Sequence, residues 1–258
     1  MSEFKSWQDF GKFERATKHR TRYIYEAEVQ AFLDTVLQTS AKRVEVLARE
    51  SILWRAQLGC GQQAICEDGV HIDDVPAPHV PERMTPRPRQ ASEGRVNPKG
   101  IPYLYLATNC DTALAEVRPW IGSFISVAQF KTLHDLRLVN CTTDQQGFRI
   151  YLAEPPAGSR EESVWADIDR AFARPVTPSD DIADYVPTQI LAELFRANDF
   201  DGVAYRSSLG EGHNVVLFDV QTTELVSCFL FELKSIRFKF EKSGEPYFVG
   251  RHRDKDGP

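Results

Sequence analysis

The chain has 258 residues, of which 42% are hydrophobic and 26% charged, and its 31 Lys and Arg against 37 Asp and Glu give a formal net charge of −6. A chain of this length and composition builds a globular core without the help of disulfides or metals. The acidic balance argues against a protein that coats nucleic acid or an anionic membrane, because such binding needs a basic surface.

The first residues lack the apolar core of a signal peptide, and no stretch reaches the roughly 18 apolar residues of a membrane-spanning helix. We therefore expect a cytoplasmic protein without membrane contacts. The five cysteines form no CxxC pair and have no His or Cys partners at zinc spacing. We expect reduced, mostly buried thiols and no metal site.

Residues 1–50 predict a helical N-terminal region. Aromatic residues recur at three-residue spacing between Phe4 and Phe13, and the apolar residues between Val29 and Leu37 follow the spacing of an amphipathic helix. The first part of this region is basic. That charge indicates either a nucleic-acid contact or a solvated helix face.

A short strand is expected at Ile52–Arg55, and a long loop follows from Gly59 to Pro102. The loop has almost no periodicity and holds seven of the fifteen prolines, and loops this long inside compact domains are usually functional or disordered. Between Arg83 and Lys99 it carries five cations against one acid. This local charge suits an anion such as phosphate, although a solvated linker would have the same composition.

The rest of the chain alternates strands with a few helices. Strands are expected at 103–107, 124–130, 136–140, 202–206, 214–218 and 236–240, and helices after Asn109 or Asp111, at 160–174 and from Pro187. Strand pairs of hairpin type outnumber βαβ units, which favours an α+β fold over a doubly wound parallel sheet. The sequence has no GxGxxG, GxxxxGK[ST], HExxH or GxSxG motif. It therefore gives no support to a Rossmann, P-loop, zincin or α/β-hydrolase enzyme.

Three separated segments resemble the RES-domain family, which is named for its Arg, Glu and Ser. Leu53–Ala56 is similar to the opening aromatic-Arg segment, Glu93–Trp120 to the central motif, and Asp201–Phe218 to the closing Tyr-x-Ser segment. The resemblance spans about residues 50 to 232. It implies an ADP-ribosyltransferase-like mixed sheet flanked by helices, with a RES domain at 51–245 that follows the helical region at 1–50.

The resemblance also implies a function, the degradation of NAD. Family members act as toxins of toxin–antitoxin pairs and cleave the nicotinamide–ribose bond by hydrolysis or phosphorolysis. NAD would then be a substrate rather than a cofactor, phosphate a co-substrate, and an antitoxin protein a partner. Such cleavage passes through an oxocarbenium-like state, which a carboxylate close to the ribose stabilises.

The residues that match the family motifs are the candidate catalytic groups. Glu116 is assigned to the ribose, and Arg95 and Arg55 are assigned to the pyrophosphate or an attacking phosphate, because a guanidinium matches those oxygens. Ser207 is assigned a hydrogen bond to the nicotinamide amide or to a ribose hydroxyl, and it is not read as a nucleophile because no His activates it. A shift of one residue in the match would put Ser208 in its place.

Three further side chains are secondary candidates for substrate binding. Tyr105 can stack on a ring or donate its hydroxyl, but a strand tyrosine can equally belong to the core. Tyr185 and Gln189 lie one helical turn apart and can line the same pocket. His213 is read as a turn residue.

Two other functions stay open at this point. One is transfer of ADP-ribose to a macromolecule, and the other is a non-enzymatic nucleotide-binding module that uses the arginine-rich loop. The sequence sets neither the acceptor nor the oligomeric state, so both a monomer and a homo-oligomer agree with it.

Overall fold

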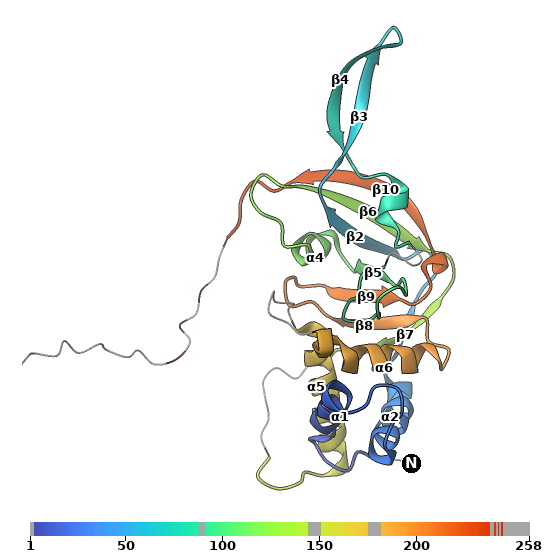
Figure 1. The fold of residues 1–258 in the computed structure, drawn as a ribbon, viewed down its shortest axis with the longest axis vertical. Coiled ribbons are helices and arrows are strands. Elements are labelled where there is room, and N and C mark those ends of the chain that lie inside the picture. The colour runs from blue at the N-terminus through green and yellow to red at the C-terminus, as the bar shows by residue number, and fades with distance from the viewer. Residues whose placement is uncertain are drawn as a thin grey trace, which may run out of the picture.

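The computed structural model describes residues 3–87, 91–143, 151–174 and 182–237, together with residues 240, 242 and 244. Within these residues, a mixed eight-stranded sheet has the order β1-β7-β8-β9-β5-β2-β6-β10 (Figure 1). Its strands are β1 (Val44–Leu47), β2 (Ile52–Leu58), β5 (Leu104–Ala107), β6 (Phe124–Thr132), β7 (Leu136–Asn140), β8 (Gly202–Arg206), β9 (His213–Leu217) and β10 (Thr223–Glu232). Among the described pairs of strands only β7 with β8 is parallel, so the predicted α+β class is confirmed.

The helices gather on the β7–β8–β9 side of the sheet, except for α3 and α4. They are α1 (Asp9–His19), α2 (Ala27–Ser40), α3 (Pro81–Met84), α4 (Cys110–Glu116), α5 (Ala157–Ala173) and α6 (Val186–Arg196), with 3-10 turns η1 (Ala41–Arg43), η2 (Ile182–Tyr185) and η3 (Val220–Thr222). Helices α5 and α6 pack on β8, and α4 packs on β2, β5 and β6. No helix in the described part of the chain is long and apolar enough to cross a membrane.

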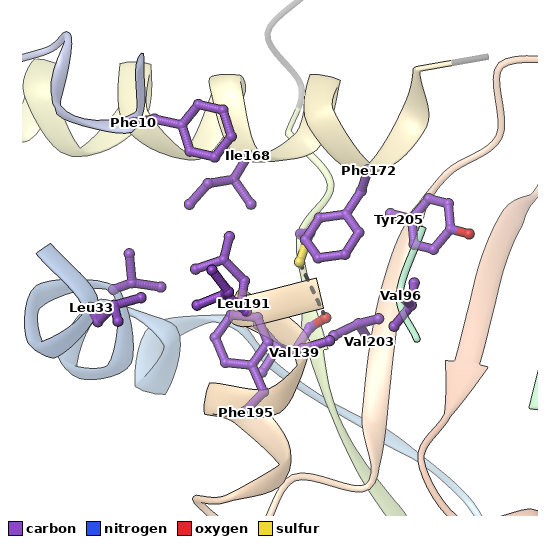
Figure 2. Close-up of a cluster of buried hydrophobic side chains, with 14 of the residues drawn as sticks. Phe10, Leu33, Val96, Val139, Ile168, Phe172, Leu191, Phe195, Val203 and Tyr205 are labelled. Atoms are coloured by element: carbon purple, nitrogen blue, oxygen red, sulfur yellow. Dashed lines mark hydrogen bonds between the residues drawn. The ribbon is translucent and has the colours of Figure 1, made fainter. Parts of the chain in front are cut away.

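The N-terminal helices share one hydrophobic core with the sheet. Phe13 of α1 stacks on Phe32 of α2 with ring centroids 4.7 Å apart, and the Trp165 indole of α5 donates a 3.1 Å hydrogen bond to the Thr39 hydroxyl of α2. Figure 2 shows side chains from α1, α2, α5, α6 and the strands meeting in this core. Burial of each large apolar side chain contributes about 1.5–3 kcal/mol, so the helical region at 1–50 is held to the rest of the molecule by packing.

The prediction of a long loop at Gly59–Pro102 is wrong for the first half of that segment. Residues 61–77 form a β-hairpin of β3 (Gly61–Glu67) and β4 (Val70–Ala77), and α3 follows it. The hairpin turns at Asp68 and Gly69, which have φ of 51° and 77°, as tight hairpin turns require. Both of its faces are largely exposed, so its strands lack the apolar alternation that identifies a half-buried strand.

Three smaller expectations also differ from the structure. The last strand among the described residues is β10. Of the strand expected at 236–240, Ile236 and Arg237 are not in a strand, and residues 238 and 239 lie outside the described residues. The region expected to be helical ends in a strand, β1, which pairs with β7 at the edge of the sheet. All five cysteines are free thiols, but only Cys141 is buried, while Cys66 is exposed.

Candidate functional site

The Glu116 carboxylate is the centre of a hydrogen-bonded group at the end of α4. Ser207 Oγ and Asn214 Nδ2 each donate a 2.7 Å hydrogen bond to the same oxygen, Glu116 Oε1. Oε2 makes no hydrogen bond to a described residue, and the side chain is exposed. One oxygen therefore orients the carboxylate while the other is open to a ligand.

The donor and acceptor positions of the Ser207 hydroxyl are all occupied by hydrogen bonds within the protein. It donates to Glu116 and accepts from the backbone N–H groups of Leu209 and Gly210 at 3.1 and 3.0 Å. A hydroxyl has one donor and two acceptor sites, so this arrangement fills them. Ser207 is buried whereas Ser208 is exposed, which distinguishes the two serines that the sequence leaves interchangeable.

The turn that carries Ser207 is held closely against the start of α4. The Gly212 N–H donates a 3.0 Å hydrogen bond to Thr112 Oγ1, and Asn109 caps the helix by accepting from the Thr112 N–H at 2.8 Å. A Cβ on Gly210 would lie 2.6 Å from Thr112 Oγ1. Glycine is required here because any side chain would push the turn, and Ser207 with it, away from α4.

Arg55 lies in a gap where two strands of the sheet diverge. Strands β2 and β5 meet at the single pair Trp54–Ala107, and the Arg55 guanidinium donates a 3.1 Å hydrogen bond to the Tyr105 carbonyl oxygen. Arg55 Nε is buried and has no hydrogen-bond partner among the described residues. Burial lowers the pKa of Arg55 to about 10, and no described acid forms an ion pair with this guanidinium.

A cavity of about 460 Å³ opens beside Arg55, and we call it the arginine cavity. Arg83 and Arg87 line it together with Arg55, and Glu82 is the single acid among the described lining residues. Arg83 and Arg87 are exposed and make no ion pair with a described residue. Two arginines of the positively charged segment predicted from the sequence, Arg83 and Arg87, thus line a cavity, whereas Arg95 does not.

Arg95 does not line the arginine cavity. Its guanidinium donates to the carbonyl oxygens of Ala171, at 2.7 Å, and Arg174, at the C-terminal end of α5, and it lies 5.3 Å from the Tyr185 ring centroid. A cation is stabilised at this end of a helix by the unpaired carbonyls and the helix dipole. Arg95 is only 9% exposed. Arg95 and Tyr185, predicted for separate roles, therefore contact each other, and neither lines the cavity beside Arg55.

Tyr105 and Gln189 both hold the segment that carries Arg95. The Tyr105 hydroxyl donates to Asn97 Oδ1 at 2.7 Å and accepts from the Val96 N–H at 3.0 Å, and burial raises the pKa of this phenol. Gln189 Nε2 lies 2.8 Å from the Gly94 carbonyl oxygen. The Tyr105 hydroxyl is thus bonded to the protein, while its side chain also lines the arginine cavity.

Tyr205 is a buried residue of β8 that received no functional role from the sequence. Burial raises the pKa of its phenol, and Tyr105 raises it further. Glu116 acts in the same direction, whereas the positive charge of Arg95 lowers this pKa. The pKa of the buried Tyr205 phenol is thus sensitive to three of the predicted site residues.

Asn214 is the second functional residue that sequence reasoning missed. It pairs with Tyr205 across β8 and β9 and with Ala107 across β9 and β5, so the three side chains form a row on one face of the sheet. A polar amide directly before the apolar run Val215–Leu217 was the available signal. No cluster of three potential metal ligands occurs in the described residues.

Comparison with known families decides the family. The model of the RES domain matches residues 71–240, which is 170 of the 258 residues. The chain belongs to the RES domain family. The RES match contains Arg95, Glu116 and Ser207 but begins after Arg55, so the opening segment at Leu53–Ala56 lies outside it.

One solved structure is similar to this RES chain. It is the crystal structure of the M. tuberculosis MbcT–MbcA toxin–antitoxin complex, with 16% identity and a TM-score of 0.42 over 76% of this chain and 92% of that chain. No curated protein matches the chain.

Proposed function

We propose that this RES-domain protein consumes NAD by cleaving the bond between nicotinamide and ribose, with water or phosphate as the acceptor. The observation that carries the proposal is the Glu116 carboxylate, which two donors hold through Oε1 and whose Oε2 makes no hydrogen bond to a described residue. A preoriented carboxylate is the group that a developing oxocarbenium ion requires.

In the proposed reaction the C1′–N1 bond breaks and its electron pair goes to the nicotinamide nitrogen. Nicotinamide leaves as a neutral ring, so its departure needs no general acid. The ribose gains positive charge, which the Glu116 carboxylate stabilises, and an oxygen of water or phosphate then bonds to C1′. Water releases a proton to the solvent in this step, whereas a phosphate dianion has no proton that must leave. Ser207 and Asn214 keep the carboxylate in place throughout.

The arginine cavity supports the binding of phosphates next to this centre. Tyr105 lines the cavity, and Ala107, two residues along β5, pairs with Asn214 in the row below Glu116. Two residues of a strand span about 7 Å, so the cavity and the row that holds Glu116 are neighbours on β5. We therefore assign the pyrophosphate of a bound dinucleotide to Arg55 and its glycosidic bond to Glu116.

We extend the proposal to the biological role that RES-family membership implies, the toxin of a toxin–antitoxin pair with an antitoxin protein as partner. Expression of the chain in a bacterial host should stop growth and lower cellular NAD. The Glu116→Ala variant, produced at the same level, should do neither. Growth arrest that persists with Glu116→Ala would contradict NAD loss as its cause.

The experiment that tests the activity is incubation of the purified protein with NAD, with and without phosphate, followed by mass analysis of the products. We expect free nicotinamide together with ADP-ribose, or with its 1″-phosphate when phosphate is the acceptor. Label from the adenine moiety that appears on a macromolecule would favour transfer instead. NAD binding that survives Glu116→Ala, weakens steeply with salt and yields no nicotinamide would favour a binding module.

A further inference from the structure

The β3–β4 hairpin is an arm with no strand partner in the described part of the molecule. It forms a two-stranded sheet of its own and projects from the body (Figure 1). The foot of the arm is firmly held, because the His79 N–H donates to Ser126 Oγ at 2.9 Å and Ser126 Oγ donates to the Gly59 carbonyl oxygen at 2.9 Å. A two-stranded hairpin is marginally stable alone, so an arm of this kind gains stability from a docked surface.

The arm, residues 61–77, has the chemistry of a docking surface. Its exposed apolar side chains are Ile65, Val70 and Ile72, and its acids are Glu67, Asp68, Asp73 and Asp74. No Lys or Arg occurs in the arm. Asp74 contacts His71, whereas Glu67 and Asp68 make no ion pair with a described residue. The surface is therefore apolar and negatively charged, and it suits a positively charged partner.

The arginine cavity has the complementary charge and lies at the foot of the arm. Val80, three residues beyond β4, is 60% exposed and lines the cavity. Arg83 and Arg87 are exposed and without ion pairs to described residues, and the buried Arg55 Nε has no hydrogen-bond partner. Acids and arginines without ion pairs to described residues thus occur in neighbouring segments of the fold, the arm and the cavity at its foot.

We infer that a second copy of this chain docks here, with the acidic arm of each copy in the arginine cavity of the other. A two-fold dimer uses one patch on both subunits, so that patch must contain both complementary features. The arm and the cavity meet this condition because they are neighbours in the fold. Seven residues of β3 extend about 23 Å, which is enough to cross a cavity of this size.

The dimer would also regulate the proposed activity, and this part of the inference rests on the proposed function. The arm fills the cavity that contains Arg55, the residue that we assign to the pyrophosphate, so the dimer is the resting form. Dissociation frees the cavity for substrate. Turnover per subunit should therefore rise on dilution and with salt, which screens the charge pairs.

Light scattering of the purified full chain at low ionic strength tests the dimer. We expect twice the monomer mass of 29.3 kDa. The arm variant Glu67→Lys/Asp73→Lys and the cavity variant Arg83→Glu/Arg87→Glu should each be monomeric, and an equimolar mixture of the two should recover the dimer. The control Glu26→Lys/Glu28→Lys makes the same change in charge as the arm variant, on exposed residues near the start of α2, and should stay dimeric.

A monomeric wild type, a dimer that survives both reversals, or a mixture that stays monomeric would overturn the inference. Nicotinamide release measured on the same samples separates it from the proposed function. The arm variant should show the higher rate per subunit at concentrations where the wild type is dimeric, and an equal rate would overturn the regulatory part. If no form releases nicotinamide, the proposed function fails while the masses still decide the dimer.

Discussion

Removal of the Ser207 hydroxyl tests whether the group around Glu116 works as the structure indicates. Ser207→Ala deletes the 2.7 Å hydrogen bond to Glu116 Oε1 and leaves Asn214 as the remaining donor. The carboxylate then turns more freely and spends less time in the reactive orientation. We expect kcat for NAD cleavage to fall while KM changes little, because Ser207 contacts Glu116 rather than the substrate.

The size of the loss follows from the type of bond. A hydrogen bond to a charged group is worth about 1.5–3 kcal/mol, and each 1.4 kcal/mol of barrier is a factor of ten. If the whole bond acts in the transition state, kcat falls roughly tenfold to hundredfold. The variant also leaves the N–H groups of Leu209 and Gly210 without their acceptor, so a lower Tm accompanies the loss.

The assay is initial-rate nicotinamide release, with circular dichroism to confirm that each variant is folded. Ser208→Ala is the matched control, because Ser208 is adjacent and exposed, and it should keep the wild-type rate. Ser207→Ala combined with Asn214→Ala should cost less than the sum of the two single losses, since both donors orient one oxygen. If a folded Ser207→Ala variant has the same rate as Ser208→Ala, the Ser207 hydroxyl does not orient Glu116 for catalysis.

Three further predictions concern binding, packing and thiol chemistry. Arg55→Met removes a buried charge that has no described acid partner. The KM for NAD should therefore rise about tenfold or more, while the urea midpoint stays the same or rises. An unchanged KM would exclude a role of Arg55 in phosphate binding. Phe13→Ala should lower the free energy of unfolding by about 3–5 kcal/mol in one cooperative urea transition, and two transitions would mean that α1 unfolds separately. Burial raises the pKa of Cys141, so a disulfide reagent should label it only on unfolding, but Cys66 at once; early labelling of Cys141 would contradict its burial.

The elements with one buried face were predictable from the sequence. Strand β8 (Gly202–Arg206) has the predicted bounds, and α4 is capped by Asn109 as its position before the apolar run indicates. These segments carry the local signals of burial, a cap residue or an apolar run. Their placement in the sheet needed the structure, because β2 and β5 pair through residues some fifty positions apart.

The hairpin and the last strand were missed for different physical reasons. The hairpin at 61–77 is exposed on both faces, so its sequence reads as polar loop despite the Asp68–Gly69 turn signal. Strand β10 lies at the sheet edge with half-buried residues along its length and a bulge near Leu225, which interrupts the alternation. Edge strands with little burial give weak periodicity.

The candidate site was predictable in its residues but only partly in its contacts. The motif match led to Glu116 and Ser207, and the structure joins them by a hydrogen bond across 91 positions. Residue type alone could not show that Arg95 caps α5 rather than facing the arginine cavity. That difference depends on where the C-terminal end of α5 lies, which is a property of the tertiary fold.

A comparison of nicotinamide release by the wild type and a Glu116 variant tests whether the Glu116 carboxylate is needed for NAD cleavage. Free nicotinamide is followed over time in the presence of NAD, wild-type protein and, in parallel, the isosteric variant Glu116→Gln. We expect steady release by the wild type and a rate at least about a hundredfold lower for the variant, since an amide cannot stabilise the positive ribose. Equal release by both proteins, or none by the wild type, would contradict this expectation.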